Sequence, residues 1–473
     1  MKRILSLSLI IALLLSLSAC QSKEDNPTSI STAPSGSQET VPSVTPEGPD
    51  PSKPTTPVVT DPPVIVDPPE IVDPPEIVDP PEIVDPPEIV DPPVIVDPPE
   101  DVDPDALWVA NCQDYINFRD YPGGTVLARI PPGGKMELLR WDGKYAYVKY
   151  NGMEGCVITN YIKPAAEDYF ATRLDTVKVT NVYTYRQLLM DIGALQIRYP
   201  DVITMDTIGT TELGRDIPVL RVGNPNAEHH VLLHGSIHAR EHMTTWLLMA
   251  MLDYWLDHDL FSYGDVCYHI IPMVNPDGVI IAQTGVLTDE QYEIYRNDQS
   301  AGYTSAAVDS YATEWKANGV GIDLNSNFLS GWGLAETYRS APSALQYPGD
   351  APFTAAESIA LRDYTLRYSF DTTISYHATG SILYYEYGTK QDVNLRSKAL
   401  GAAVSAVSGY TMVNSVGVNG GGYKDWAIDE LEIPSLTIEI GCDVCPLAER
   451  ELYSIFARNC QVLPAIAQWL QTQ

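Results

Sequence analysis

The chain has 473 residues, of which 29 are lysine or arginine and 62 are aspartate or glutamate, so its formal net charge is −33. This length exceeds what one hydrophobic core accommodates and predicts two or three domains. The acidic balance excludes a general affinity for nucleic acid, because phosphate contacts need a basic face.

The N-terminus has the features of a bacterial export signal. Lys2 and Arg3 precede an apolar run from Ile4 to Leu17, which is too short for a permanent membrane-spanning helix. The run ends in Leu-Ser-Ala-Cys20, which resembles the lipobox of bacterial lipoproteins and implies cleavage before Cys20 and lipidation of its thiol. We therefore expect residues 1–19 to be a signal peptide and the mature protein to be extracytoplasmic, lipid-anchored to the cell membrane. A plain secretory signal is the alternative.

Residues 20–105 are expected to form a linker. The first part is rich in Ser, Thr and Pro, and from Asp61 to Asp97 the unit Asp-Pro-Pro recurs every six residues. Because proline fixes φ and pushes the preceding residue to extended geometry, the repeats predict a stiff polyproline-like spacer. At roughly 3.1 Å per residue it spans on the order of 100 Å. This length suits a protein that is anchored in a membrane and acts in a cell wall. A neutral linker is the alternative.

Residues 106–165 have a different pattern, in which short alternating strands are separated by turns. The pair Asn151-Gly152 between two alternating runs is a strong hairpin signal. The segments INFRDYPGGTVLARIPPGG and YAYVKYNGMEGCVITNYI resemble a bacterial Src-homology-3-like domain, a small all-β barrel. This resemblance implies binding to cell-wall peptide, and a spacer role is the alternative.

Residues 180–473 alternate between helical and strand patterns, which predicts an α/β domain with a mixed, mostly parallel sheet flanked by helices. A helix capped by Thr184 is expected to run through Tyr199, and the apolar run from Met243 to Leu256 predicts a buried helix. We expect strands at Ile217 to Val222, His230 to His234, Cys267 to Val274, Thr372 to His377 and Ser435 to Ile440, and a closing helical stretch from about Leu447 to Leu470.

Six cysteines remain if Cys20 is lipidated, and in an oxidising compartment an even number favours disulfides. Cys112 and Cys156 fall in the small β domain and can pair there. The pairing of the other four is open: Cys267, Cys442, Cys445 and Cys460.

A metal site is predicted where the strand ending at His234 gives way to a helix. His238 and Glu241 are three residues apart at this junction and can bind one metal ion. Catalytic zinc commonly takes two imidazoles, one carboxylate and a water molecule, so a second histidine is required. His377 ends another strand and precedes a chain reversal, at the sheet edge where ligand-binding residues gather. A hydrogen-bonded structural histidine is the alternative for His377, and the spacing of His238 and Glu241 is by itself a weak signal.

From about Tyr183 to the C-terminus the chain resembles the zinc metallocarboxypeptidase family. Five motifs agree in order: HGSIHARE, NPDG, GIDLN, NGGGYKDW and SLTIEIG. The resemblance implies these roles: His238, Glu241 and His377 bind one zinc ion, Glu439 is the general base, Asp323 orients a ligand imidazole, and Arg240 contacts substrate. A turn-capping role is the alternative for Asp323, and a surface ion pair is the alternative for Arg240.

The chemistry agrees with these roles. Zinc lowers the pKa of bound water towards 7, while a nearby carboxylate takes the proton and later gives it to the leaving amine. Glu439 lies in an otherwise apolar strand, where an unpaired carboxylate without a function would be costly.

The chain departs from the family at its substrate residues. Family members clamp the substrate's terminal carboxylate with an Asn-Arg pair, whereas here Asn325 is followed by Ser326. The arginine that helps to hold the oxyanion is also missing, and Lys316 or Arg296 are candidate replacements. Lys424 falls at the position that sets side-chain preference, where a cation favours a carboxylate-bearing group such as diaminopimelate. A solvated loop lysine is the alternative.

We therefore expect a zinc-dependent peptidase that acts on peptidoglycan stem peptides, resembling γ-D-glutamyl-diaminopimelate peptidases. Its expected partners are these peptides, the cell wall through the small β domain, and the membrane through the lipid. A broad carboxypeptidase acting on protein fragments and a catalytically decayed wall-binding lipoprotein are the alternatives.

Overall fold

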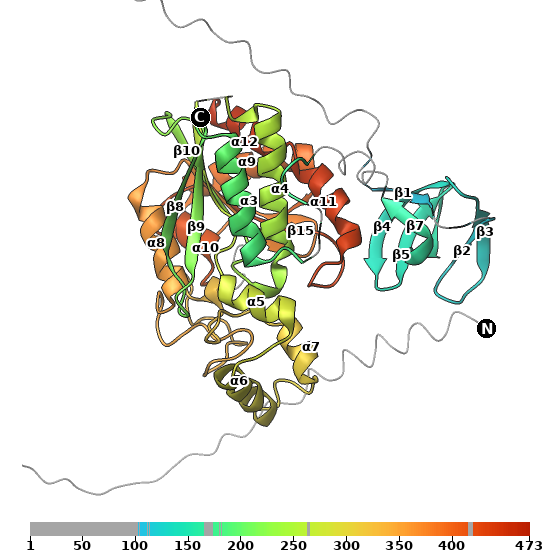
Figure 1. Ribbon diagram of the computed structural model, residues 1–473, viewed down its shortest axis with the longest axis horizontal. Coiled ribbons are helices and arrows are strands. Elements are labelled where there is room, and N and C mark those ends of the chain that lie inside the picture. Colours follow the sequence, from blue (N-terminus) through green and yellow to red (C-terminus); the bar gives the residue numbers. More distant parts are fainter. Residues whose placement is uncertain are drawn as a thin grey trace, which may run out of the picture. The chain divides into compact units, whose positions relative to one another are not determined.

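The computed structural model describes residues 103, 105–110, 112, 114–164, 174–178, 180, 182–262, 265–414 and 420–473 (Figure 1). The expected signal peptide, Cys20 and nearly all of the linker lie outside these residues. Within the described part of the chain, no helix has the length and apolar character needed to cross a membrane.

The first folded part is a seven-stranded sheet in which every paired strand is antiparallel, in the order β3-β2-β6-β5-β4-β1-β7. The predicted hairpin joins β5 to β6, and Asn151 and Gly152 in its turn both have positive φ, of 50° and 77°. That geometry matches the twist of a two-residue hairpin, which explains the Asn-Gly pair. The strands are β1 (Ala106–Val109), β2 (Ile116–Arg119), β3 (Val126–Ile130), β4 (Lys135–Asp142), β5 (Tyr145–Tyr150), β6 (Met153–Ile158) and β7 (Ile162–Pro164).

The second folded part is built on an eight-stranded mixed sheet in the order β14-β13-β15-β12-β10-β11-β9-β8. Its centre is parallel, from β11 through β10 and β12 to β15. The pairs β8–β9, β9–β11 and β13–β15 are antiparallel, and the edge pair β13–β14 is parallel. The strands are β8 (Ile203–Thr210), β9 (Asp216–Val222), β10 (His229–His234), β11 (Val266–Ile271), β12 (Thr372–Ala378), β13 (Ile382–Tyr384), β14 (Thr411–Val413) and β15 (Ser435–Ile440). The predicted α/β fold with a mostly parallel sheet is confirmed.

All five predicted strands are present, with bounds close to those expected. β11 stops at Ile271 instead of Val274, because Pro272 has no N–H with which to extend the ladder. The sequence did not predict β8, β13 or β14. β8 is an edge strand with mostly exposed residues, and β13 and β14 have only three residues each.

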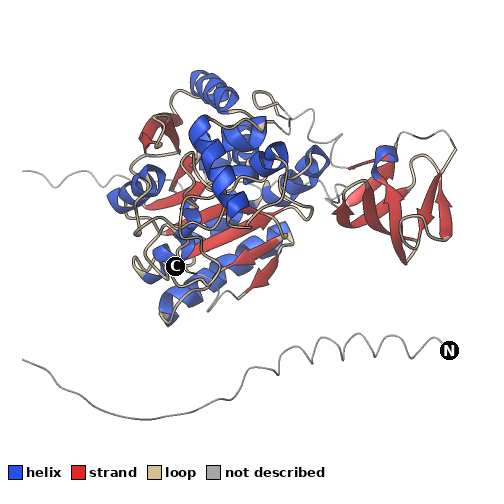
Figure 2. Cartoon of the chain, turned by 90° about the horizontal axis from the view of Figure 1, so that it is seen from below, coloured by secondary structure: helices blue, strands red, loops and turns tan. Residues whose placement is uncertain are grey.

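Helices cover both faces of this sheet (Figures 1 and 2). Alternate residues of β10 enter opposite cores: Val231 and Leu233 pack with α3, α4, α9, α11 and α12, whereas Leu232 packs with α8 and α10. The helices are α3 (Tyr185–Arg198), α4 (Met243–Asp257), α5 (Pro276–Thr284), α6 (Asp289–Ser300), α7 (Val308–Thr313), α8 (Ala356–Arg367), α9 (Gln391–Ser408), α10 (Tyr423–Asp429), α11 (Leu452–Asn459) and α12 (Val462–Leu470), with 3-10 turns η1 (Thr159–Tyr161), η2 (Ala239–Glu241), η3 (Leu260–Ser262), η4 (Leu324–Ser326) and η5 (Glu449–Glu451).

The predicted helices are also present. Thr184 caps α3 by accepting a hydrogen bond from the backbone N–H of Gln187, and every residue of α4 from Met243 to Leu256 is buried. The closing helical stretch is divided into α11 and α12.

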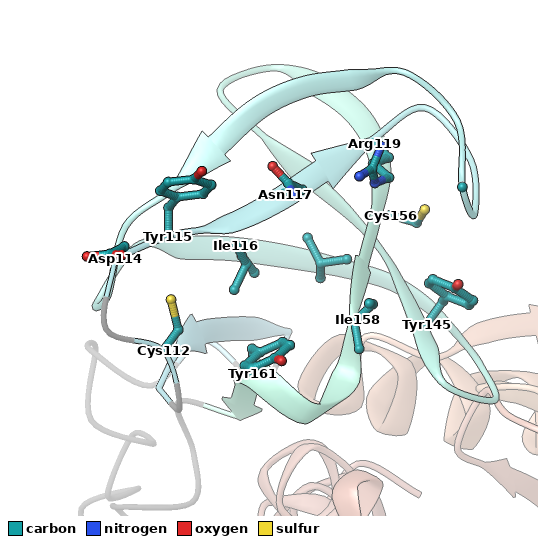
Figure 3. A pocket seen from close by; sticks show the side chains of 12 residues that line it. Cys112, Asp114, Tyr115, Ile116, Asn117, Arg119, Tyr145, Cys156, Ile158 and Tyr161 are labelled. Carbon is teal, nitrogen blue, oxygen red and sulfur yellow. The ribbon is translucent and has the colours of Figure 1, made fainter.

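The cysteines differ from expectation. The six that the structure describes are all free thiols, so the favoured disulfides are not formed in this structure. Cys112 and Cys156 line one pocket of the small sheet, but they lie at opposite ends of it (Figure 3). Their shared domain therefore does not bring the two thiols together.

Candidate metal centre and active site

Two neighbouring parallel strands bring the predicted ligands to one edge of the sheet. In the pairing of β10 with β12, His234 lies opposite Ser375, so both strands end at the same edge. The chain leaves β10 through Gly235 and reaches His238, the residue just before η2. His377 is the last residue but one of β12. Residues separated by about 140 positions in the sequence therefore meet here.

The turn after β10 is anchored to the first turn of α4. Ser236 has a positive φ of 48°, which is unusual for a residue with a side chain. Its backbone N–H donates to Thr244 Oγ1 at 2.7 Å, and its hydroxyl lies 2.7 Å from Thr245 Oγ1. These buried hydrogen bonds offset the backbone strain and fix the direction in which the chain reaches His238.

The three predicted metal ligands converge. Glu241 Oε1 lies 2.8 Å from His238 Nδ1, and Glu241 Oε2 lies 2.9 Å from His377 Nδ1. The two Nδ1 atoms are 3.1 Å apart, and all three side chains are buried. The predicted site of His238, Glu241 and His377 is therefore assembled as a single cluster of ligand atoms.

This donor set fits a zinc ion. Zn–N bonds of about 2.0–2.1 Å in a tetrahedral site separate two nitrogens by roughly 3.3 Å, close to the observed distance between the imidazoles. Two imidazoles and one carboxylate also leave one position for water, as catalytic zinc sites do.

Asp323 contacts the ring nitrogen of His238 that does not face the ligand cluster. Its Oδ1 lies 3.4 Å from His238 Nε2, while Oδ2 pairs with Lys316 Nζ at 3.1 Å and accepts the Gln346 N–H at 3.1 Å. Burial alone would raise the pKa of Asp323, but Lys316 and His238 hold it well below its ordinary value. A permanent carboxylate at Nε2 favours the tautomer that leaves Nδ1 free to bind metal.

Glu439 lies on β15 directly beside His377, its register partner on β12. Register partners project from the same face of a sheet, so its carboxyl faces the metal cluster. Burial raises the pKa of Glu439 to about 7; His377 opposes the shift and Glu241 adds to it. A carboxyl group that titrates near neutrality can accept a proton and return it.

The predicted substrate residues are distributed around this cluster. Arg240 is half-buried in η2, and Asn325 lies in η4, where its Oδ1 accepts the N–H of Tyr423 at the start of α10. Lys424 is buried in α10 instead of solvated in a loop. Its ammonium donates to Asp425 Oδ1 at 2.6 Å and to the carbonyl of Glu386 at 3.0 Å. Lys424 is thus ion-paired with Asp425, and its role in substrate preference stays a prediction.

The structure separates the two candidates for the missing oxyanion arginine. Lys316 pairs with Asp323, the carboxylate beside His238 Nε2. Burial alone would lower the pKa of Lys316, but the charges of Asp323 and Glu241 raise it above its ordinary value. Arg296 lies on an exposed face of α6, paired with Glu293 at 3.1 Å. Of these two candidates, Lys316 is therefore the one that lies at the site.

Cys445 is a neighbour of the site that the sequence did not identify. Its Sγ donates to the carbonyl of Arg240 at 3.2 Å. Burial raises the pKa of its thiol well above the ordinary value, and the charges of Glu241 and Glu439 add to this rise. The Cys-x-x-Cys spacing with Cys442 was its only signal in the sequence.

A family model described as zinc carboxypeptidase (peptidase family M14) matches residues 188–457, which include every residue of this cluster. The chain belongs to the zinc carboxypeptidase family. It is a metallopeptidase-type hydrolase whose family uses zinc, and His238, Glu241 and His377 are the residues that fit the ion.

Two curated relatives and one solved structure resemble this member of the zinc carboxypeptidase family. The γ-D-glutamyl-L-diamino acid endopeptidase 1 of Lysinibacillus sphaericus is 30% identical over 289 residues, covering 58% of this chain and 69% of the relative. Carboxypeptidase B of Bos taurus is 25% identical over 324 residues, covering 62% and 72%. The crystal structure of thrombin activatable fibrinolysis inhibitor matches with a TM-score of 0.50 at 20% identity, covering 66% of this chain and 84% of that one, and supports the fold.

Proposed function

We propose that this zinc carboxypeptidase family member is an extracytoplasmic peptidase that hydrolyses amide bonds in peptidoglycan stem peptides. The observation on which this depends is the convergence of two imidazoles and one carboxylate beside Glu439. The zinc ion that this cluster fits would polarise the scissile carbonyl and acidify a bound water molecule.

Glu439 acts as the general base and then as the general acid. Its carboxylate takes a proton from the water as the water oxygen forms a C–O bond to the carbonyl carbon. It then delivers this proton to the nitrogen, so that the C–N bond breaks and the products are a carboxylic acid and an amine. The elevated pKa of about 7 suits both transfers, because neither form of the carboxyl is strongly disfavoured near neutral pH.

Lys316 takes the place of the missing oxyanion arginine. Its ammonium pairs with Asp323, the carboxylate beside His238 Nε2, and we propose that it also donates to the oxygen that becomes negatively charged. Removing one such donor costs about 3 kcal/mol of transition-state stabilisation in other enzymes.

The substrate class is inferred from the carboxylate clamp and from the relative. Ser326 stands where an arginine would pair with Asn325, so the chain lacks the fork that grips a terminal carboxylate. The relative from Lysinibacillus sphaericus is named for a γ-D-glutamyl-L-diamino acid bond, which is found in wall peptides. Carboxypeptidase action on protein fragments is the second candidate, supported by the similarity to bovine carboxypeptidase B.

Attachment to the wall and membrane completes the proposal. Cys20 would hold the lipid and the linker would span the distance to the wall. The seven-stranded sheet, which we propose is the Src-homology-3-like wall-binding module, has a cavity of about 660 Å³. Tyr115, Arg119 and Tyr161 line this cavity and offer aromatic and cationic contacts to a wall peptide (Figure 3).

The test compares substrates with purified full-length protein. Stem peptides containing γ-D-glutamyl-diaminopimelate and ordinary unmodified peptides are incubated separately, and products are identified by mass spectrometry. We expect cleavage of the γ-D-glutamyl bond and little release of C-terminal residues from ordinary peptides. Release of C-terminal amino acids from ordinary peptides alone would replace the wall-specific proposal with the carboxypeptidase one.

A further inference from the structure

A second group of potential metal ligands lies on β10 and β11. His230, Cys267 and His269 each offer one ligand atom, and these three atoms all lie within 4.8 Å of one another. None of the three belongs to the catalytic cluster.

The register of the two parallel strands brings these side chains together. His230 on β10 is the register partner of Cys267 on β11. His269 follows Cys267 by two residues, so both project from the same face of the sheet. His230 lies near the start of β10, and the strand ends four residues later at His234. At roughly 3.3 Å per residue this is about 13 Å along the strand, and the catalytic ligands lie beyond that end.

The imidazole nitrogens are arranged as a metal site requires. His230 Nδ1 lies 3.0 Å from His269 Nε2, so both point into one small space. The other nitrogen of His269, Nδ1, lies 2.7 Å from the hydroxyl of Tyr364 on α8. A hydrogen bond from Nδ1–H to that hydroxyl leaves Nε2 with its lone pair directed at His230 and Cys267, which is how outer partners commonly orient ligand histidines.

The surroundings keep both imidazoles neutral. Burial lowers the pKa of His269 to about 3 and also lowers that of His230. The rings of Tyr368 and Phe370 pack against His269 with centroid distances of 4.5 and 4.9 Å. Neutral imidazole is the form that binds metal, so no proton has to leave either histidine.

Two charged residues border the group. Arg221 on β9 is the register partner of His269, and its charge opposes protonation of His269 while it favours the thiolate of Cys267. Asp371 accepts the backbone N–H of His230 at 2.9 Å and lies 3.3 Å from His229 Nδ1. The group is therefore bordered by one cation and one anion, and Arg221 partly offsets the cost that burial adds to forming the Cys267 thiolate.

We propose that His230, Cys267 and His269 bind one thiophilic transition-metal cation, of the Zn²⁺ or Cu⁺ class, that joins β10 to β11. Two imidazoles and one thiolate are ligands that such ions prefer over carboxylates and carbonyls. Solvent completes the coordination on the side of the half-buried His230. The site is structural, and it is separate from the hydrolytic centre.

Binding changes the protonation of one group. Burial raises the pKa of the Cys267 thiol to about 11, so without metal the thiol keeps its proton near neutral pH. As the S–metal bond forms, the S–H bond breaks and one proton passes to solvent, so each ion bound at this site releases one proton.

Metal content tests the proposal without measuring activity. Full-length protein is stripped with chelator, reloaded with Zn²⁺, passed through a desalting column and analysed for zinc per chain. We expect about two zinc ions for the wild type and about one each for Cys267→Ala and for His377→Ala. One zinc ion in the wild type, with no loss in Cys267→Ala, would overturn the second site.

Cobalt substitution identifies the ligand directly. The His377→Ala protein loaded with Co²⁺ should show a thiolate-to-cobalt charge-transfer band, which the double variant with Cys267→Ala should lack. Cys460→Ala is the matched control, because Cys460 is a buried free thiol that donates to the carbonyl of Ala457. Should Cys267→Ala fail to fold, Cys267→Ser replaces it, because serine keeps the size of the side chain and removes the sulfur. A band that persists without the Cys267 sulfur would assign the thiolate to another cysteine and reject the proposal.

Discussion

Glu439 and His377 are register partners on adjacent parallel strands, so a carboxyl group with a pKa of about 7 stands beside a metal-ligand imidazole. The position of this pair is set by sheet hydrogen bonding and not by a mobile loop. Its consequences for zinc binding and turnover can be separated by substitution.

Replacing Glu439 by Gln should preserve zinc binding and nearly abolish turnover. Glutamine keeps the size of the side chain but cannot accept a proton, and general acid–base catalysis contributes about 10²–10⁴-fold. Zinc content and hydrolysis of stem peptide are measured on the same preparation. Glu432→Gln, at an exposed residue paired with Lys390, is the control and should behave as wild type. Unchanged hydrolysis in Glu439→Gln would remove this residue from the mechanism.

Asp323→Asn should weaken zinc binding by about 10–100-fold, the usual effect of losing the partner that orients a ligand histidine. The neutral amide no longer favours the tautomer with Nδ1 free on His238, and it also leaves Lys316 without its carboxylate. Competition with a chelating dye measures the affinity. Asp350→Asn, which removes a carboxylate bonded to the Tyr347 hydroxyl, serves as the comparison. Equal affinities in the two variants would show that Asp323 does not orient His238.

Lys316→Met should lower kcat by about 10²-fold with a smaller effect on KM, because a donor to the oxyanion acts in the transition state. Lys316→Arg keeps the charge and the partner of Asp323, and we expect it to retain most of the activity. Steady-state kinetics on stem peptide distinguish the two. If Lys316→Arg is as impaired as Lys316→Met, the role of Lys316 is packing and not charge.

Ionisation of the buried Glu357 should lower the free energy of unfolding as the pH rises. Burial raises the pKa of Glu357 from 4.5 to about 7, so the folded state keeps the proton that the unfolded chain releases. The contribution of Glu357 to the free energy of unfolding is therefore fully present below about pH 4.5. It is lost as the pH rises to about 7, and it amounts to on the order of 3 kcal/mol. Glu357→Gln should flatten that part of the pH profile of unfolding, and the exposed Glu293→Gln should not. Parallel profiles for Glu357→Gln and the wild type would contradict this assignment.

The cavity of the small sheet should affect wall binding without affecting chemistry. Tyr115 and Tyr161 line it, and both are partly exposed. A Tyr115→Ala, Tyr161→Ala double variant should sediment less with purified sacculi while cleaving soluble stem peptide at the wild-type rate. Tyr121→Ala tests specificity, because Tyr121 is more exposed than either but does not line the cavity. Equal loss of sedimentation in both variants would indicate general surface adhesion.

The ligand set could be predicted from sequence because its signals are local. His238 and Glu241 are three residues apart after a strand, and His377 ends another strand, so alternation of strands and helices places both at one edge. Glu439 was identifiable as a charge within an apolar strand. The five predicted strands were found for a similar reason, since each is a short run rich in β-branched or other apolar residues that is mostly buried.

Other features depend on which strands become neighbours, and periodicity does not specify this. Nothing in the sequence pairs His230 with Cys267, and nothing in it chooses Lys316 over Arg296.

The burial of Lys424 could not be predicted from the sequence for a different reason. Its acceptor Asp425 is adjacent in sequence, but only the fold buries both and shows that the charge is already compensated.

The hydrogen bonds from Ser236 to Thr244 and Thr245 tie the ligand turn to a helix that is buried from Met243 to Leu256. The conformation of this turn is thus set by contacts that involve none of the three ligand side chains. A substitution of one ligand should therefore remove a donor atom while leaving the path of the chain through the turn unchanged.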